Sequence, residues 1–488
     1  MAFTRKSNIV IIYKVKRKSY GLDHWFPEAG ITGKNIQVWR IMMKQSRNDP
    51  EKIDSLTSGI SRREFLQLSA ITGIGLMVGC AVNPVTGKRE LMLMSEAQEI
   101  NIDKQNSPHQ ISADYGTTRD KALNDYVAQV GRSITPHTHR PDMPYSFHTL
   151  NAPYVNAYAF PGGTIGITRG ILLSLENEAE LASLIGHEAG HVTSRHTSQR
   201  MTRGLIASVV LTGATVAAGD QMGDLVAGLG GIGAGALLAG YSRNQEREAD
   251  SLGLEYMAGS GYNPEGFLGL MDMLNEMSGK NESYMAVLFS THPMSSERYQ
   301  TAVSEVNRKY AAEKETRPLY RERYMDNIAN LRKIEPAITA MQAGDGEMMK
   351  KNPPKAAEHY ERSLKTAPED YAGNLKMAKC LLAQEKNSDA LRFARKAQEI
   401  YPEEPQAKHV SGVTHIRLKN FEKALAQFND YEKVLPGNPN TTFFQGFSLE
   451  GMGRREPSAQ KYYDYLQLVN QGEYAQHARA RLKEWGYI

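Results

Sequence analysis

The chain has 488 residues, of which 41% are hydrophobic and 23% charged, enough for two or three domains with substantial cores. Its formal net charge is +4, but residues 1–79 hold 13 of the 58 Lys and Arg and only 6 of the 54 Asp and Glu. The remainder has 45 basic and 48 acidic residues. This balance gives no support to a basic surface that binds nucleic acid.

The first distinctive segment is "SRREFLQLSAITGIGLMVGC", residues 61–80. Its apolar run, 66–79, is too short for a transmembrane helix, which leaves a buried core helix or an export signal. "SRREFL" resembles the twin-arginine export signature, and "MVGC" resembles a lipobox whose cysteine becomes lipidated. We therefore predict that residues 1–79 are a leader, whose true start lies at Met42 or Met43, and that Cys80 carries a lipid anchor. The mature protein is then a periplasmic lipoprotein, sorted to the outer membrane where the cell has one.

Strand and helix signals follow in chain order. "NAYAFPGGTIGITRGIL" contains two apolar runs broken by Pro-Gly-Gly, which predicts a hairpin. Within it, Gly162, Gly163, Thr164 and Ile165 are a candidate exposed edge strand for an extended substrate peptide, an ordinary sheet strand being the alternative. "ENEAELASLIGHEAGHVTSRHTSQRM" predicts one long helix, in which Gly186 and Gly190 indicate close packing or access.

Two helical regions come next. Residues 204–240 are rich in glycine and alanine, which favours a packed helical hairpin, with contact to a membrane as the alternative. "YSRNQEREADSLGLEYMAGSGY" predicts an amphipathic helix that ends at Gly261 and Pro264.

The C-terminal third contains an internal repeat of 34 residues. Prolines recur at 368, 402 and 436, alanines at 356, 390 and 424, and small residues at 344, 378, 412 and 446. The residues at 360, 394, 428 and 462 fill one equivalent packing position. This register resembles tetratricopeptide repeats and predicts about four helix pairs followed by a capping helix, "EYAQHARARLKEW".

The residues from His187 to His191 form the motif HEAGH. Histidines four apart share one helix face, so both imidazoles can reach one Zn²⁺ ion per chain. Glu188 then lies beside the metal and can take a proton from a metal-bound water. The alternative is that the two histidines are structural.

A zinc site of this kind needs a third protein ligand. The metzincin spacing is absent, because Ser194 and Thr197 stand where that class has glycine and histidine. Glu246 and Asp250 lie four apart on a later helix, so Glu246 can bind zinc while Asp250 accepts a hydrogen bond from a ligand histidine. We interpret His196 as structural and Glu248 as a surface residue.

The segments "HEAGH", "YSRNQEREAD" and "THPMSSER" resemble the zinc peptidase family that includes the CAAX prenyl proteases and the mitochondrial peptidases of the OMA type. The resemblance covers about residues 85–310 and implies that His187, His191 and Glu246 are ligands and Glu188 the catalytic base. It also draws attention to His292 and Arg298. His292 is an oxyanion donor, a latency ligand in the fourth zinc position, or simply part of a turn. Arg298 would orient a carboxylate or stabilise the intermediate, and Tyr158 and Tyr241 are further candidate donors.

We therefore expect a mainly α (α+β) fold. The predicted parts are the leader (1–79), a zincin-like metallopeptidase domain with a small β-sheet (80–310), a helical connector (311–336) and an α-solenoid of repeats (337–488). The resemblance implies a zinc endopeptidase for misfolded or stalled envelope proteins, active in outer-membrane protein quality control. The expected partners are unfolded envelope polypeptides, a protein bound by the repeats, and the membrane through the lipid. The alternative is a repeat-based chaperone or scaffold with a largely latent zinc site.

Overall fold

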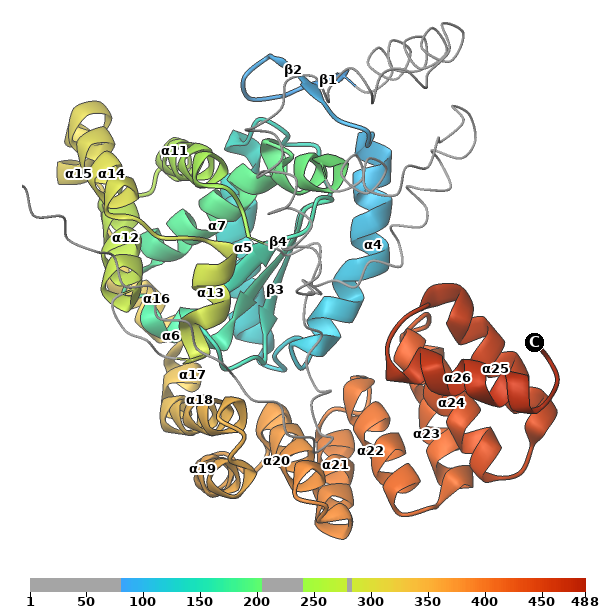
Figure 1. The fold of residues 1–488 in the computed structure, drawn as a ribbon. Helices are drawn as coiled ribbons and strands as arrows, with labels where there is room; N and C mark the ends of the chain where they lie inside the picture. Colours follow the sequence, from blue (N-terminus) through green and yellow to red (C-terminus); the bar gives the residue numbers. More distant parts are fainter. Residues whose placement is uncertain (1–79, 204–239, 279–282) are drawn as a thin grey trace, which may run out of the picture. The chain divides into compact units, whose positions relative to one another are not determined.

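The computed structural model describes residues 80–203, 240–278 and 283–488 (Figure 1). The leader and nearly all of segment 204–240 lie outside the described residues, so the export signal and both readings of that segment stay predictions. Within the described ranges, no helix combines the length and the apolar character that crossing a membrane requires.

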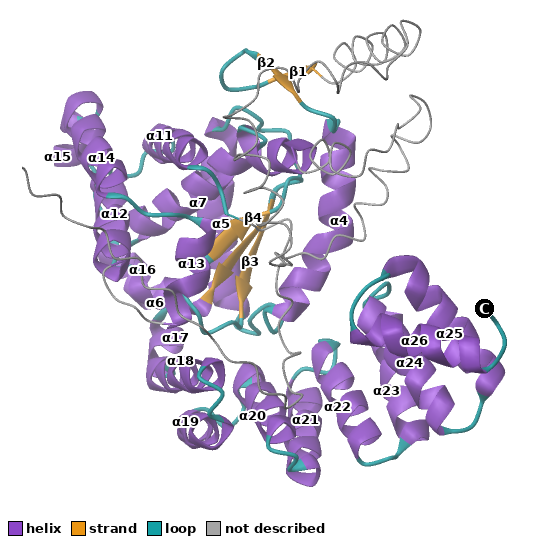
Figure 2. Ribbon diagram, viewed as in Figure 1, coloured by secondary structure: helices purple, strands orange, loops and turns teal. Residues whose placement is uncertain are grey.

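The first elements surround a small sheet with helices (Figure 2). Strand β1 pairs antiparallel with β2, and helix α4 begins with a capping box in which Ser95 and Gln98 exchange hydrogen bonds. Helix α5 is amphipathic and turns its buried face toward strand β3 (Ser146–Leu150). The elements are β1 (Cys80–Val82), β2 (Arg89–Leu91), α4 (Glu96–Ala113), α5 (Lys121–Ile134) and the 3-10 turn η2 (Thr135–His137).

The main sheet has three strands in the order β3-β5-β4. Strand β3 (Ser146–Leu150) runs parallel to β5 (Thr164–Thr168), whereas β4 (Ala157–Ala159) pairs with β5 antiparallel. The predicted hairpin is thus confirmed as β4 and β5, joined by a turn in which Gly163 has a φ of 102°.

The prediction of an exposed edge strand at residues 162–165 is wrong. Thr164 and Ile165 open β5, the central strand, whose five residues are all buried between neighbours on both sides. Gly162 and Gly163 belong to the preceding turn, where a Cβ on Gly162 would meet Asp103. Strand β5 is central because β3, which comes earlier in the chain, pairs with it on the side away from β4.

Helix α6 (Arg169–Ser174) leads into α7 (Glu178–Thr193), which carries the HEAGH motif. All residues of α7 are buried, and its first turn is capped by Asn177, whose side chain accepts from the backbone N–H of Glu180. The prediction of one long helix is wrong at its end. Arg195 adopts a left-handed conformation with φ 57°, and the chain becomes helical again over 196–203.

Helix α11 (Arg243–Gly259) packs directly on α7. A Cβ on Gly186 would lie 2.8 Å from the carbonyl oxygen of Gly253, and one on Gly190 would lie 3.1 Å from Cα of Ala249. Gly186, just before the motif, and Gly190, within it, therefore serve close packing, one of the two readings that the sequence left open. The next elements are α12 (Glu265–Ser278), η4 (Ser283–Met285), α13 (Ala286–Thr291), α14 (Ser296–Lys309), α15 (Ala311–Thr316), α16 (Arg321–Asn327) and α17 (Ala329–Lys333).

The C-terminal third folds as successive antiparallel helix pairs with a last single helix, as the 34-residue period predicts. Three of the repeated small residues face the predicted aromatic partners. A Cβ on Gly344, Gly412 or Gly446 would lie 2.5–2.9 Å from the ring of the residue sixteen positions on, Tyr360, Phe428 or Tyr462. The helices are α18 (Glu335–Met349), α19 (Pro353–Thr366), α20 (Tyr371–Ala383), α21 (Asn387–Ile400), α22 (Gln406–Arg417), α23 (Phe421–Val434), α24 (Pro439–Gly451), α25 (Arg455–Leu468) and α26 (Glu473–Glu484).

The repeats contact the N-terminal part through buried polar groups. Arg169 forms an ion pair of 2.5 Å with Asp370, and both side chains are about 5% exposed. The ring of Tyr115 lies 4.7 Å from the ammonium group of Lys376, and Glu404 accepts a hydrogen bond from Ser112. Together with a shared apolar core, these contacts join the first repeats to the elements around the sheet.

Candidate metal centre

Two imidazoles of helix α7 meet across one turn. His187 and His191 are 5% and 2% exposed, and their Nε2 atoms lie 3.1 Å apart. The four-residue spacing places both rings on the face that looks toward α11 and α13. Since two neutral nitrogens at this distance repel one another unless a proton or a metal ion lies between them, the pair is a candidate set of metal ligands.

Glu246 reaches the same point from α11. Its Oε1 lies 3.5 Å from Nε2 of His191, and its Oε2 lies 3.7 Å from Nε2 of His187. The side chain is fully buried. Burial opposes its charge, but His292 and His191 outweigh that effect and hold the pKa of Glu246 well below its usual range. The carboxylate is therefore ionised, as a ligand must be.

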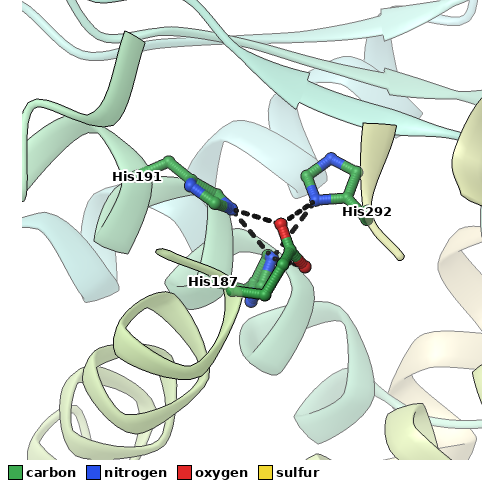
Figure 3. A group of neighbouring side chains, drawn as sticks. His187, His191 and His292 are labelled. Atoms are coloured by element: carbon green, nitrogen blue, oxygen red, sulfur yellow. Dashed lines mark hydrogen bonds and ion pairs between the residues drawn. The ribbon is translucent and has the colours of Figure 1, made fainter. Parts of the chain in front are cut away.

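His292 completes the cluster from the end of α13. Its Nδ1 lies 3.5 Å from Nε2 of His187 and 3.2 Å from Oε1 of Glu246. Figure 3 shows the three histidine rings turned toward one another around a common point. One ligand atom from each of the four residues falls within 4.8 Å of all the others, so the cluster could hold a metal ion.

The spacing of these atoms suits a tetrahedral ion. Ligands about 2.0–2.1 Å from such an ion lie roughly 3.3 Å from each other. Five of the six pairs among His187, His191, Glu246 and His292 approach to 3.1–3.7 Å, and all four ligand atoms lie within 4.8 Å of one another. Imidazole and carboxylate are also a usual ligand set for the divalent ions of peptidases. The residues present therefore fit a metal ion.

Glu188 lies beside this cluster without joining the ligand set. It is 1% exposed, and its Oε1 lies 3.7 Å from Nε2 of His292. Its Oε2 has no hydrogen-bond partner among the described residues. Burial raises the pKa of Glu188, against the opposing effect of His292 and His187. A carboxylate with a raised pKa and a spare oxygen at a metal site can accept a proton.

Asp250 and Arg298 support the ligands from behind. Oδ1 of Asp250 lies 3.0 Å from Nδ1 of His187, on the side of the ring away from the cluster. Arg298 donates to both oxygens of Asp250 at 2.7 Å, and its Nη1 lies 2.7 Å from Oε2 of Glu246. Arg298 is 3% exposed, and its guanidinium contacts both carboxylates. It therefore orients Asp250 and Glu246.

The two candidate tyrosine donors point elsewhere. The hydroxyl of Tyr158 donates to Oδ2 of Asp114 at 2.7 Å. Tyr241 stacks on the ring of His191 with centroids 3.7 Å apart, while its hydroxyl lies 3.2 Å from Oγ1 of Thr197. Tyr241 therefore holds the ring of His191 rather than presenting its hydroxyl to the cluster. Cys80 stands in β1, far along the chain from these residues.

Sequence reasoning missed the surroundings of His191. Nδ1 of His191 lies 2.9 Å from Nδ1 of His196, and Nε2 of His196 lies 3.4 Å from Oε2 of Glu248. Glu248 is partly buried and is not a plain surface residue. The signal was hidden because residues five apart on a continuous helix diverge, and only the turn at Arg195 brings His196 back.

Comparison with known proteins defines the class to which this arrangement belongs. Residues 121–306 match peptidase family M48, and residues 347–411 match the tetratricopeptide repeat. The chain thus contains an M48 metallopeptidase domain followed by tetratricopeptide repeats, inside the predicted ranges 80–310 and 337–488.

Individual relatives carry related names. The chain is 29% identical over 200 residues to the beta-barrel assembly-enhancing protease of Yersinia pestis, covering 38% of this chain and 40% of that one. It is 29% identical over 175 residues to the mitochondrial metalloendopeptidase OMA1 of Schizosaccharomyces pombe, covering 36% and 50%. It is 25% identical over 247 residues to the metalloprotease YcaL of Escherichia coli, covering 48% and 94%. The first two matches span half or less of the relative's length.

Proposed function

We propose that the chain is a zinc-dependent endopeptidase that degrades misfolded or stalled envelope proteins, in the quality control of outer-membrane protein assembly. The observation that carries the proposal is the meeting of His187, His191 and Glu246 beside Glu188, whose Oε2 has no hydrogen-bond partner within the part of the chain that the structure describes. The M48 match and the names of the relatives support the reaction class and the setting.

The roles of the residues follow from their atoms. His187, His191 and Glu246 would hold the zinc ion. When bound, the ion polarises a peptide carbonyl and lowers the pKa of its water to about 7. Glu188 takes the proton from the attacking water and later passes it to the leaving amine. Asp250 fixes the proton of His187 on Nδ1, which leaves Nε2 free to bind the ion.

His292 has two candidate roles, and its distances favour latency. Nδ1 of His292 stands as close to His187 and Glu246 as those ligands stand to one another. A fourth protein ligand would occupy the position that water needs, so the centre would rest inactive until His292 moves away. As an oxyanion donor instead, His292 would be needed in every turnover.

One pair of variants separates these roles. Glu188→Gln should lower proteolysis of an unfolded polypeptide by the zinc-loaded full chain about 100- to 10,000-fold, with unchanged zinc content. His292→Ala should raise the basal rate if it is a latency ligand and lower it if it is an oxyanion donor. Zinc-loaded parent that cleaves no unfolded polypeptide, together with an equally inactive His292→Ala, would contradict the endopeptidase proposal.

A chaperone or scaffold is the second candidate, because a fourth ligand at the metal would keep the protease silent for much of the time. The repeats would then bind client or partner proteins on their own. Glu188→Gln discriminates here too. If that variant loses all cleavage yet still restores envelope assembly in cells, binding is a separable function.

Envelope location rests on the leader and on Cys80. We propose export of the chain and lipidation at Cys80, with outer-membrane sorting. The variant Cys80→Ser should leave the membrane fraction on carbonate extraction if lipid is the anchor. Retention of that variant in the membrane would point instead to another attachment.

A further inference from the structure

A second chain of hydrogen bonds stands behind the metal cluster, on the side of His191. We propose that His196 and Glu248 are positioning residues for the ligand His191: Nδ1 of His196 accepts a hydrogen bond from Nδ1–H of His191, and Glu248 holds His196 in the tautomer that can do so. The inference rests on the proposed zinc site and concerns two residues outside the HEAGH motif.

The directions of the hydrogen bonds follow from the ligand role of His191. Its Nε2 faces the cluster, 3.1 Å from Nε2 of His187, so a bound ion requires that nitrogen to be unprotonated. The proton of neutral His191 then lies on Nδ1, which is 2.9 Å from Nδ1 of His196. His196 must therefore accept at Nδ1 and carry its own proton on Nε2.

That proton points at Glu248. Nε2 of His196 lies 3.4 Å from Oε2 of the carboxylate, whose Oε1 in turn accepts from the hydroxyl of Ser194 at 3.1 Å. His196 has no exposed surface, so its two nitrogens depend on these protein partners. Each nitrogen has one, and with His191 as a ligand the hydrogen bonds run outward, from His191 to His196 and from His196 to Glu248.

The backbone is bent to make this contact. On an unbroken helix a residue five positions after His191 would point about 140° away from it. Arg195 instead takes a left-handed conformation, φ 57°, which is unfavourable for a side chain with a Cβ. The bend is held by Glu99, which is fully buried and accepts from Nε of Arg195 at 2.8 Å and from the hydroxyl of Ser198.

The two ligand histidines are thus supported in different ways. His187 meets the carboxylate of Asp250 directly, at 3.0 Å, whereas His191 meets the carboxylate of Glu248 through the imidazole of His196. Both arrangements fix the tautomer of the ligand and turn its ring toward the ion. Losing such a support typically lowers metal affinity about 10- to 100-fold.

The test measures zinc retention in the full chain, with Glu188→Gln as the parent so that proteolysis does not interfere. His196→Phe keeps a ring but removes the acceptor, and should speed zinc transfer to a chromophoric chelator about 10- to 100-fold. His196→Asn places an oxygen near the position of Nδ1 and should rescue part of the loss. Glu248→Ala should show a smaller loss, and Glu255→Ala, exposed on the same helix α11, should match the parent.

The metal-free melting temperature separates positioning from general structure. We expect His196→Asn and Glu248→Ala to melt like the metal-free parent while losing zinc faster. If His196→Phe does not fold, these two variants decide the matter alone. The inference is overturned if the parent and both variants retain zinc equally well. It is also overturned if the variants lose zinc faster only in proportion to a lowered melting temperature. A parent that binds no zinc overturns the zinc site itself.

Discussion

Glycine brings elements together in two different ways in the two halves of the protein. Between α7 and α11 it lets two backbones touch, since a Cβ on Gly186 would meet the carbonyl oxygen of Gly253. In the repeats it leaves a hollow for an aromatic ring, as Gly412 does for Phe428. A clash with a backbone atom cannot be relieved by a substitution in the partner helix. A clash with a ring can, because a smaller side chain can replace the ring.

The second helix pair of the repeats shows that exchange. Where the other pairs combine a glycine with an aromatic residue, α20 and α21 carry Ala378 and Ala394, both fully buried. Where the small residue carries a Cβ, its partner has no ring, so more than one combination of side chains satisfies this position. The contact of α7 with α11 instead fixes how far Glu246 stands from His187, and few sequences satisfy that. Substitutions in the two regions should therefore differ in kind.

The largest effect is expected at the backbone contact. Gly186→Ala places a Cβ 2.8 Å from the carbonyl oxygen of Gly253, so α11 must move away and carry Glu246 with it. A displacement of about 1 Å at a catalytic site costs on the order of 100-fold in rate. We expect that loss in kcat/KM on an unfolded polypeptide, with weaker zinc binding measured by chelator competition.

Gly259→Ala is the matched control, because it lies on the same helix α11 but the nearest atoms to its Cβ would be those of the His137 side chain, at 3.3 Å or more. It should leave both measurements near the parent values. A Gly186→Ala protein with parental zinc affinity and rate would show that the two helices are not held by this contact.

Much of this organisation can be predicted from the sequence, because repeats and helix faces recur at fixed spacings along the chain. The 34-residue register identifies the repeats, and the four-residue spacing within HEAGH and between Glu246 and Asp250 identifies one helix face each. The turn at Arg195 was not predictable, because it depends on Glu99, almost a hundred residues earlier. Without that turn, His196 is an unremarkable buried histidine. The place of β5 in the sheet was missed for a related reason: strand order depends on the parallel partner β3, not on the hairpin itself.

A smaller effect, of a different kind, is expected in the repeats. Gly412→Ala puts a Cβ 2.6 Å from the fully buried ring of Phe428, and such overpacking costs about 1–3 kcal/mol of unfolding free energy. Introduced into a Phe428→Ala protein, the same change should cost almost nothing, since it recreates the alanine pair of the second repeat. Urea unfolding of the four proteins measures this coupling.

Zinc retention should be the same in all four proteins. Substitutions in the repeats should differ in this respect from Gly186→Ala at the α7–α11 contact, which should weaken zinc binding. Additive costs in the double variant would show that glycine and ring do not share one space. Faster zinc loss on Gly412→Ala would show that the packing of the repeats reaches the metal centre.

The smallest effect is expected at Glu404, where the repeats contact helix α4 of the N-terminal half. Burial raises the pKa of this carboxyl to about 7, although Ser112, the N–H of Gln406 and nearby lysines favour its charged form. The folded protein therefore binds this proton more readily than the unfolded chain, whose glutamate has a pKa near 4.5. This contribution to stability is complete below pH 4.5 and is lost as the pH rises to 7. The difference corresponds to at most about 3 kcal/mol.

Glu404→Gln removes the charge and keeps the shape, so it should stabilise the protein at pH 8 by about 1–2 kcal/mol once the loss of charge-assisted hydrogen bonds is counted. At pH 4 the variant and the parent should unfold at nearly the same urea concentration, because the parent carboxyl is then largely protonated in both the folded and the unfolded chain. Taking the difference between the two proteins at each pH cancels every other titrating group, the metal ligands included. If the difference in unfolding free energy between the two proteins stays constant from pH 4 to pH 8, the carboxyl is not buried between Ser112 and the repeats. A gap that opens as the pH rises means that the repeats hold the catalytic half through a group that charges near neutrality.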